Sequence, residues 1–372
     1  MKLLMISGDI SLAKGDQGPF YYMLEKFSSY FERIDIICPP VSEPMVQQIH
    51  GNVFVHASQG HLLFHPFFIK KKGLALFKEH RHDLMVVHGY PPFYNEMGAL
   101  KIWRKTKLPF VLEYHHITGY PRPADLKEKV YLAWSKIFIP RYAKKAIAVR
   151  TVNSLQVPEF LKRVGVDEKK IIYIPSFYID FSVFQPDELV DKKYDLVFCS
   201  RLVENKGILN LVKAVKIAKA EIDDVKLVII GSGPLKKPIE KMVKKNGLQN
   251  NISFAGWLPA IEDVADVYRR SRVFVMPSFN EGGPRVSLEA MACGLPVITT
   301  RVGIMNEIIE NKQNGLFVDW TPEDLAEKIV LVLKNQETIG EMGQQALATV
   351  SVFQREGMIK NYAEKLIAMI KE

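Results

Sequence analysis

Residues 277–300 read Pro-Ser-Phe-Asn-Glu-Gly-Gly-Pro-Arg-Val-Ser-Leu-Glu-Ala-Met-Ala-Cys-Gly-Leu-Pro-Val-Ile-Thr-Thr. An apolar run of strand length ends at Met276, just before this stretch, and a second run, Val297–Thr299, closes it. Between the two runs, Pro284 suits the first position of a helix, and Gly294 suits the left-handed residue beyond its end. A strand, a glycine-bearing loop, a helix and another strand in this order predict one unit of a parallel α/β sheet.

The same alternation continues in both directions along the chain. Ile208, Leu211, Val212 and Val215 fall at i, i+3, i+4 and i+7, the spacing of one helix face. The apolar runs form two series, which are Leu3–Ser7, Ile34–Cys38, Leu84–His88, Phe110–Tyr114 and Ala146–Val149, then Leu196–Ser200, Leu227–Gly231, Ile252–Phe254, Val273–Pro277 and Val297–Thr299. Runs that are apolar on both faces and separated by helical periods predict two doubly wound parallel sheets.

Length and composition agree with two α/β domains. The chain has 372 residues, of which 48% are hydrophobic and 24% charged, as in ordinary globular proteins. The polar stretch Phe181–Lys193 is interrupted by Pro186 and is predicted to be the interdomain linker. We therefore expect one domain over residues 1–183 and a second over 184–350. Residues 351–372 are expected to form a helix that returns to the first domain.

The cysteines and the N-terminus favour a reducing, cytoplasmic setting. Cys38, Cys199 and Cys293 are far apart and lie in apolar runs, which predicts buried thiols rather than a disulfide or a metal site. The apolar run near Met1 is too short for a signal peptide. No stretch of 18 apolar residues occurs, so no membrane span is expected.

The loop before the predicted helix has the features of a phosphate or sugar-hydroxyl cradle. Gly282 and Gly283 allow a close approach of backbone to ligand, and the amides of the next helix face it with partial positive charge. Arg201 and Lys206 bracket the loop after another strand and would add a bidentate fork and a point charge for a diphosphate. The alternative is a plain helix cap, with Arg285 and Glu289 a surface pair of little energetic value.

In these residues the chain resembles the family 4 retaining glycosyltransferases, and the resemblance spans nearly the whole chain. That family is marked by two glutamates separated by seven residues at the start of an Ala-Met-Ala helix, as are Glu281 and Glu289. Further motifs agree in order, namely Arg201–Gly207, Gly231–Pro234, Phe254–Leu258, Asn306–Ile309 and Asn314–Val318. The resemblance implies the GT-B architecture, in which two Rossmann-like domains face each other across a cleft. It also implies sugar transfer from a nucleotide diphosphate donor.

The resemblance also implies roles for single residues. Glu281 would hold a hydroxyl of the donor sugar, together with the amides of Gly282 and Gly283 and of the helix that begins at Pro284. Glu289 would bind the ribose. Arg201 and Lys206 would bind the diphosphate. The segment Gly231–Pro234, with Gly231 and Gly233, and Trp257 would lie near the base. His115 matches a histidine beside the donor sugar, and His116 replaces a commonly acidic neighbour. Gly18 is the best match to a glycine pair that the family often carries after its first strand.

The chemistry that this resemblance implies needs no cofactor and no metal. In the retaining scheme a donor phosphate oxygen takes the acceptor proton. The chain has no Asp-x-Asp pair, Cys-x-x-Cys or His-Glu-x-x-His motif to hold a divalent ion. Alternatives are another GT-B enzyme, such as a nucleotide-sugar epimerase or a phosphorylase, and a non-catalytic nucleotide-sugar-binding protein. A Rossmann dehydrogenase is disfavoured because no Gly-x-Gly-x-x-Gly follows a strand.

The net charge of +9 is concentrated in the first half of the chain. Residues 51–150 carry 17 Lys and Arg against 6 Asp and Glu, a net of +11, whereas the other 272 residues sum to −2. The cations alternate with aromatic residues such as Phe64, Phe67, Trp103 and Trp134. This pattern favours either docking on an anionic membrane surface, as for a glycan or lipid-linked acceptor, or a core whose aromatics are coated by cations. Nucleic acid is not expected. The sequence leaves donor sugar, base, acceptor and oligomeric state open.

Overall fold

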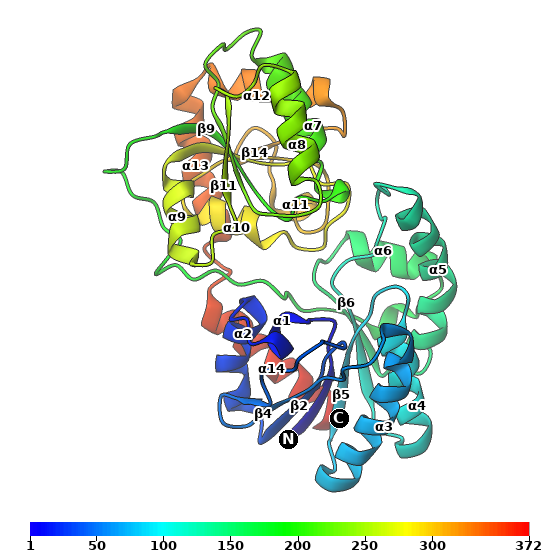
Figure 1. The fold of residues 1–372 in the computed structure, drawn as a ribbon. Coiled ribbons are helices and arrows are strands. Elements are labelled where there is room, and N and C mark those ends of the chain that lie inside the picture. The colour runs from blue at the N-terminus through cyan, green and yellow to red at the C-terminus, as the bar shows by residue number, and fades with distance from the viewer. Residues whose placement is uncertain (372) are drawn as a thin grey trace. The chain divides into compact units, whose positions relative to one another are not determined.

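A computed structural model describes residues 1–371 as two compact units (Figure 1). Of the described residues, unit 1 comprises 1–118, 130–176 and 356–371, and unit 2 comprises 119–129 and 177–355. The expected second domain was residues 184–350, whereas unit 2 runs from Phe177 to Arg355 and also includes residues 119–129. The predicted linker, Phe181–Lys193, is free of helix and strand and lies within unit 2.

The sheet of unit 1 has the strand order β3-β4-β2-β1-β5-β6-β7-β8. All neighbouring strands are parallel except β3 and β4, which are antiparallel. The strands are β1 (Lys2–Ile6), β2 (Arg33–Ile37), β3 (Gln48–Ile49), β4 (Val53–His56), β5 (Leu84–His88), β6 (Phe110–Tyr114), β7 (Ala148–Thr151) and β8 (Ile171–Tyr173). The chain first builds outward from β1 on one side and then, from β5, on the other. The strand order therefore reverses between β1 and β5, a position where ligands bind in such sheets.

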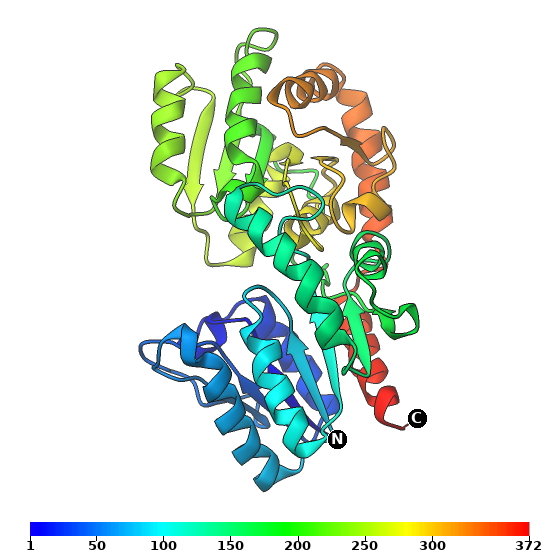
Figure 2. The same cartoon turned by 90° about the vertical axis from the view of Figure 1, so that its right-hand side faces the viewer.

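Helices cover both faces of this sheet. Figures 1 and 2 show α3 and α4 on one face and α2 with α14 on the opposite face. Tyr362 of α14 stacks on Phe27 of α2, with ring centroids 4.8 Å apart. The helices are α1 (Ser11–Lys14), α2 (Pro19–Phe27), α3 (His65–His80), α4 (Tyr94–Thr106), α5 (Leu126–Ala143), α6 (Gln156–Arg163) and α14 (Arg355–Lys371), with short 3-10 turns η1 (Ser28–Tyr30), η2 (Leu62–Phe64) and η3 (Glu168–Lys170).

Unit 2 repeats the plan with a six-stranded parallel sheet in the order β11-β10-β9-β12-β13-β14. Its strands are β9 (Tyr194–Cys199), β10 (Leu227–Ile230), β11 (Ile252–Gly256), β12 (Ser271–Met276), β13 (Val297–Thr299) and β14 (Gly315–Phe317). Here the strand order reverses between β9 and β12. The loops that follow these two strands thus flank the second position where this architecture binds ligands.

The helices of unit 2 form two groups. In Figure 1, α7, α8 and α12 lie on one side of its sheet, whereas α9, α10 and α13 lie on the other. They are α7 (Ile208–Ala218), α8 (Lys236–Lys245), α9 (Ile261–Arg269), α10 (Arg285–Ala292), α11 (Met305–Ile308), α12 (Pro322–Leu333) and α13 (Gln336–Val350), with a 3-10 turn η4 (Glu204–Lys206) before α7.

The structure confirms the predicted two-sheet α/β fold element by element. All ten predicted strands are present, and the predicted face of α7, including Ile208, Leu211 and Val215, is buried. The three cysteines are free and buried. The missed strands β3, β4, β8 and β14 have two to four residues each and lie at or beside sheet edges. Among residues 1–371, no helix is long and apolar enough to cross a membrane.

Candidate functional site

The predicted donor-binding residues gather on loops at the carboxyl edge of the unit 2 sheet. Residues 200–207 follow β9, and residues 277–284 follow β12, its neighbour in the sheet. Backbone contacts join these loops, since the amide of Phe279 donates to the carbonyl of Asn205 at 2.8 Å. The amide of Ile304, in the loop after β13, donates to the carbonyl of Gly282 at 2.9 Å. Parallel strands end at the same edge of a sheet, which is why residues far apart in sequence converge here.

Glycines at positive φ permit this close packing of loops. Gly207 has φ +68°, and a Cβ placed there would lie 2.0 Å from the carbonyl oxygen of Pro277. At Gly231, with φ +127°, a Cβ would lie 1.9 Å from the carbonyl oxygen of Ser200. Real carbon–oxygen contacts are longer by more than an ångström, so any side chain would push the loops apart. Gly231 therefore shapes the loop that carries Arg201.

Lys206 and Glu281 form a largely buried ion pair. The ammonium contacts Glu281 Oε1, and the two side chains retain only 12% and 14% of their exposure. The Ser278 hydroxyl lies 3.4 Å from the same carboxylate oxygen. Ser278 is in turn fixed because its carbonyl accepts hydrogen bonds from Thr300 and from the indole of Trp320. A cation and a carboxylate are thus held side by side in the loops beyond the strand ends.

Glu289 lies one helical layer deeper, in α10. Its carboxylate accepts a hydrogen bond from Arg285 Nε at 2.7 Å, and its side chain is 9% exposed. Burial raises the pKa of Glu289, and the Arg285 guanidinium opposes that rise. Arg285 also covers the ring of Tyr178, at 4.5 Å from the ring centroid. The alternative interpretation of Arg285 and Glu289 as a surface pair is wrong, because the pair exists but is withdrawn from solvent.

The other predicted donor residues lie in loops or at a helix start beyond the carboxyl ends of the unit 2 strands. Arg201 is exposed directly after β9, and Trp257, directly after β11, is 71% exposed. Helix α10 begins at Arg285, one residue later than predicted, so that Pro284 is its N-cap, and Gly294 has the expected left-handed φ of +79°. Gly283 has no room for a side chain, since a Cβ would meet the ring of Phe177 at 2.5 Å. Gly233 similarly lies against the backbone of Leu202.

The structure adds residues to this loop that sequence reasoning missed. Asn280 is buried, and its amide donates to Glu128 Oε2 at 2.8 Å and to the carbonyl of Arg122 at 3.1 Å. Segment 119–129, from the first half of the chain, is thereby fastened to the loop that carries Glu281. Burial raises the pKa of Glu128, and the hydrogen bond from Asn280 opposes the rise. No local signal in the sequence pairs positions 152 residues apart.

In unit 1 a second polar cluster lies at the corresponding sheet edge. Glu113, in β6, is fully buried, and Arg150 Nη1 and the Tyr362 hydroxyl donate to its Oε1 at 2.8 Å and 2.7 Å. Its Oε2 lies 3.2 Å from His88 Nε2 and 3.7 Å from His115 Nε2. Although burial opposes ionisation, Arg150 and the two imidazoles hold the pKa of Glu113 well below its usual range. Burial lowers the pKa of His115.

Of this cluster, only His115 was predicted from the sequence. His88, Glu113, Arg150 and Tyr362 were missed, although Glu113 and Arg150 interrupt otherwise apolar strands, which is the one local signal available. His116 is exposed. Gly18 is the N-cap of α2, with Pro19 at the first helical position. The predicted roles of His115 and Gly18 in donor binding remain predictions.

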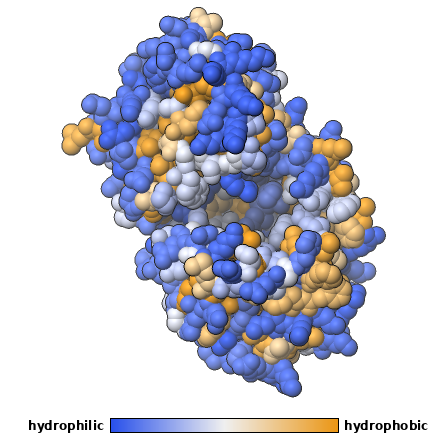
Figure 3. Space-filling view, in the orientation of Figure 1, coloured by the Kyte–Doolittle hydropathy of each residue, from blue (hydrophilic) through white to orange (hydrophobic). Residues whose placement is uncertain are grey.

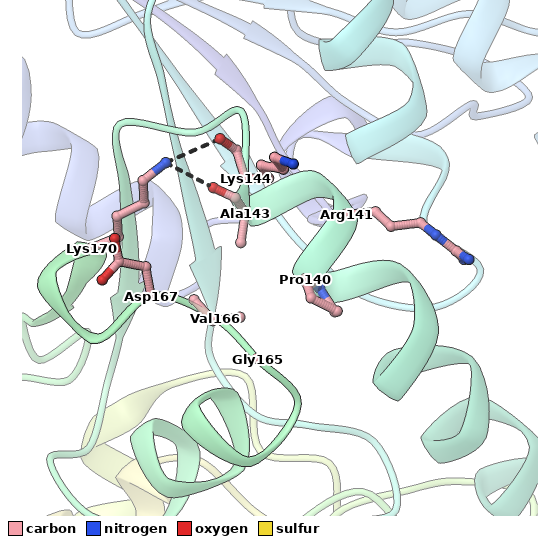
Figure 4. Close-up of a pocket in the computed structure, with 8 residues that line it drawn as sticks. All are labelled: Pro140, Arg141, Ala143, Lys144, Gly165, Val166, Asp167 and Lys170. Carbon is pink, nitrogen blue, oxygen red and sulfur yellow. Dashed lines mark hydrogen bonds between the residues drawn. The ribbon is translucent and has the colours of Figure 1, made fainter.

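Unit 1 also has a pocket of about 430 Å³ at the end of α5 (Figure 4). None of the predicted site residues lines it. Lys170 is occupied there, because its ammonium donates to the carbonyls of Ala143, Lys144 and Ala146, the last at 2.8 Å. A lysine that caps the last carbonyls of a helix stabilises that helix end. Lys170 therefore has a structural role at the end of α5, and we assign no catalytic role to this pocket.

The known proteins that this chain resembles in sequence are glycosyltransferases. Residues 181–348 match the family described as "Glycosyl transferases group 1". An uncharacterized glycosyltransferase of Methanocaldococcus jannaschii is 38% identical over 258 residues, which are 67% of this chain and 66% of that protein. Across the curated relatives that it matches, the chain spans between about one third and two thirds of their length.

Solved structures agree over the whole chain. A sucrose-phosphate synthase from Thermosynechococcus elongatus superposes with a TM-score of 0.82 at 19% identity, covering 100% of this chain and 99% of that one. The Anabaena protein HepE, in complex with UDP and glucose, gives a TM-score of 0.76 at 18% identity, covering 99% and 100%. At these identities the likeness concerns the fold, and the fold is GT-B.

Proposed function

We propose that this chain, which belongs to the GT-B glycosyltransferase superfamily, moves a hexosyl-type sugar from a nucleotide diphosphate donor to an acceptor with retention of anomeric configuration. The observation that carries the proposal is the convergence of Lys206, Glu281 and the opening of α10 at the strand-order reversal of unit 2. HepE, a protein of the same fold, holds UDP and glucose.

The proposed chemistry uses preorganised positive charge. As the bond to the anomeric carbon breaks, negative charge grows on the diphosphate, and fixed cations aimed at it lower the barrier. Arg201, exposed at the mouth of the site, would supply a bidentate fork, and Lys206 a point charge. The first amides of α10 would add the partial positive charge of a helix N-terminus.

The ion pair of Lys206 with Glu281 is proposed to open when donor binds. Each partner then exchanges the other for a ligand group, because the diphosphate attracts the ammonium and sugar hydroxyls donate to the carboxylate. The exchange keeps both buried charges compensated, which matters since an unpaired buried charge costs several kcal/mol. Glu289 keeps Arg285 as its partner and would offer its second oxygen to the ribose.

Substitution of the two cations tests this account. Arg201→Ala and Lys206→Ala are each expected to lower kcat about 10²–10³-fold, the usual effect of removing one donor to a developing anion. Lys213→Ala is the matched control, since Lys213 is an exposed cation of α7, the helix that follows Lys206. The electrostatic account is wrong if both variants turn over at the control rate with UDP-, GDP- and ADP-sugars.

Retention, metal independence and the alternative functions are each tested by a separate measurement. Retention is checked by proton NMR of the first product formed, which should keep the donor's anomeric configuration. Transfer without a metal on the diphosphate predicts full activity after chelation and desalting. The epimerase alternative predicts a changed donor sugar in reactions that contain no acceptor, and the non-catalytic alternative predicts donor binding without any product.

A specific surface favours an acceptor at an anionic membrane. Leu63, Phe64 and Phe67, around the start of α3, are 60%, 66% and 61% exposed, and Trp134 and Ile137 of α5 are also exposed. Lys101 lies over the Phe67 ring, and Figure 3 shows apolar side chains at the surface on the side of α3 and α5. Phe64, Phe67 and Trp134 are exposed and do not belong to the core. For these three residues, the alternative that the aromatics form a core coated by cations is therefore wrong. We propose that this surface docks on the anionic cytoplasmic face of a membrane.

Vesicle binding tests the docking surface. The full chain should sediment with phosphatidylglycerol vesicles at low salt but not with phosphatidylcholine alone, since each nearby cation adds about 1 kcal/mol on an anionic surface. Phe64→Ser with Phe67→Ser should abolish sedimentation. Leu189→Ser is the matched control, because Leu189 is a 96% exposed apolar residue of unit 2. Equal binding by all three proteins, or none by the native chain, excludes this surface.

A further inference from the structure

Three side chains of unit 1 turn potential metal ligands toward one point. His88 ends β5, Glu113 lies in the adjacent strand β6, and His115 follows β6 directly. One potential ligand atom from each of these three residues lies within 4.8 Å of the other two. We propose that these residues bind one divalent metal ion such as zinc. This goes beyond the proposed transfer reaction, which assigns the diphosphate to side chains of unit 2.

The distances suit such an ion. With metal–ligand bonds of roughly 2.0–2.2 Å, tetrahedral coordination separates ligand atoms by roughly 3.3–3.6 Å. Glu113 Oε2 lies 3.2 Å from His88 Nε2 and 3.7 Å from His115 Nε2. Both distances lie within about 0.1 Å of this range, and the ligand atoms of the two imidazoles lie within 4.8 Å of each other. Two imidazoles and one carboxylate form a common ligand set for zinc and iron(II).

Two atoms of the cluster have unmet bonding capacity. Glu113 Oε2 and His115 Nε2 are both buried, and neither has a hydrogen-bond partner among residues 1–371. His88 Nε2 is near enough to Oε2 for a hydrogen bond, yet the two are misaligned for one. Neighbouring atoms that do not point at each other are expected when their lone pairs converge on a third centre. A buried carboxylate oxygen without any partner is costly, and an ion would remove that cost.

The surroundings hold the ligands in place. Arg150 and Tyr362 occupy only Oε1 of Glu113, which fixes the carboxylate and leaves Oε2 for the ion. Ser7, directly after β1, places its hydroxyl 3.4 Å from His88 Nδ1 and orients that ring. Such outer partners are a regular part of metal sites, and their loss typically weakens metal binding by about 10–100-fold.

Charge and access set the character of the site. Arg150 already balances Glu113, so a bound dication brings uncompensated positive charge, and affinity is expected to be lower than in sites with two or more thiolates. Three protein ligands leave a coordination position for water or an anion, which reduces this charge. The His115 side chain is 44% exposed although its Nε2 is buried, so one of the three ligands lies at the surface of the unit. The site is thus expected to be exchangeable rather than structural.

Cobalt(II) reports directly on this coordination. We would titrate tag-free full-length protein, stripped by a chelator, with Co²⁺ and record the visible d–d absorption. The expected result is saturation at one ion per chain, reversed by Zn²⁺. His115→Ala, which removes a half-exposed ring, should abolish the spectrum, and Tyr362→Phe should weaken binding by about 10-fold or more while leaving all three ligands.

His61→Ala is the matched control, since His61 is an exposed histidine of the same unit, and its spectrum should equal that of the native chain. The proposal is overturned if the native protein gives no d–d bands on addition of Co²⁺. It is equally overturned if His115→Ala and Tyr362→Phe bind Co²⁺ as the native protein does. Neither result affects the donor site, because the readout is spectroscopic and does not use transfer activity.

Discussion

Gly207 is the position where a single methyl group should reveal how the donor loops are assembled. It lies between Lys206 and α7 with φ +68°, and a Cβ there would stand 2.0 Å from the carbonyl oxygen of Pro277. Pro277 begins the loop that carries Glu281. Gly207→Ala therefore perturbs two things at once, the backbone conformation of Gly207 and the contact between the two loops.

Gly247 separates these two effects. Its φ is +65°, nearly that of Gly207, but a Cβ there would have no atom within 4 Å. Gly247→Ala thus carries only the left-handed strain, about 1–2 kcal/mol. Gly207→Ala carries the same strain plus an overpacking cost of about 1–3 kcal/mol, because a carbonyl must move by more than an ångström. The expected loss of unfolding free energy is about 2–5 kcal/mol for Gly207→Ala and about 1–2 kcal/mol for Gly247→Ala.

Urea unfolding and steady-state transfer rates measure the difference. Gly207→Ala should lose activity well beyond its loss of stability, because the shift displaces Lys206 relative to Glu281. Gly247→Ala should retain the native kcat. If the two variants are equally stable and equally active, the close approach of the loops has no energetic weight and the reasoning fails.

Further predictions concern buried polar groups. Burial raises the pKa of Glu96 to about 8, so the stability that its neutral form contributes is present below pH 4.5 and is lost as pH rises toward 8. Glu96→Gln should remove this pH dependence, on the order of 4–5 kcal/mol by linkage, in urea titrations between pH 5 and 8.5. Burial lowers the pKa of His65 to about 4, so the stability that its neutral form contributes is present above pH 6.5 and is lost as pH falls. The His65→Phe variant should therefore be more stable than the native protein in urea unfolding near pH 4. Asn280→Ala should cost about 1.5–3 kcal/mol through its lost bond to Glu128 and should lower kcat. The control Asn250→Ala, which changes an exposed asparagine of the same unit, should do neither.

Much of the donor half-site could be predicted from local sequence. Apolar runs on both faces identify buried parallel strands, and the ends of such strands meet at one sheet edge whatever the details of packing. Arg201, Lys206 and Glu281 lie in the loops that follow β9 and β12, so their gathering near one edge was predictable. The spacing of Glu281 and Glu289 also places the first in the loop before the helix and the second inside that helix.

What the sequence by itself determined about this protein is the set of elements, because strand and helix periodicity and glycine punctuation act over a few residues. The i,i+4 spacing of Arg285 and Glu289 already indicated one pair, which the structure buries, but only the tertiary structure decided which residues distant in sequence pair with the other buried polar groups. The pairing of Lys206 with Glu281, of Asn280 with Glu128, and of Glu113 with Arg150 and Tyr362 joins positions tens to hundreds of residues apart. Such pairs arise because a buried charge must find compensation wherever the packed chain brings a partner within reach, and no local pattern encodes that choice.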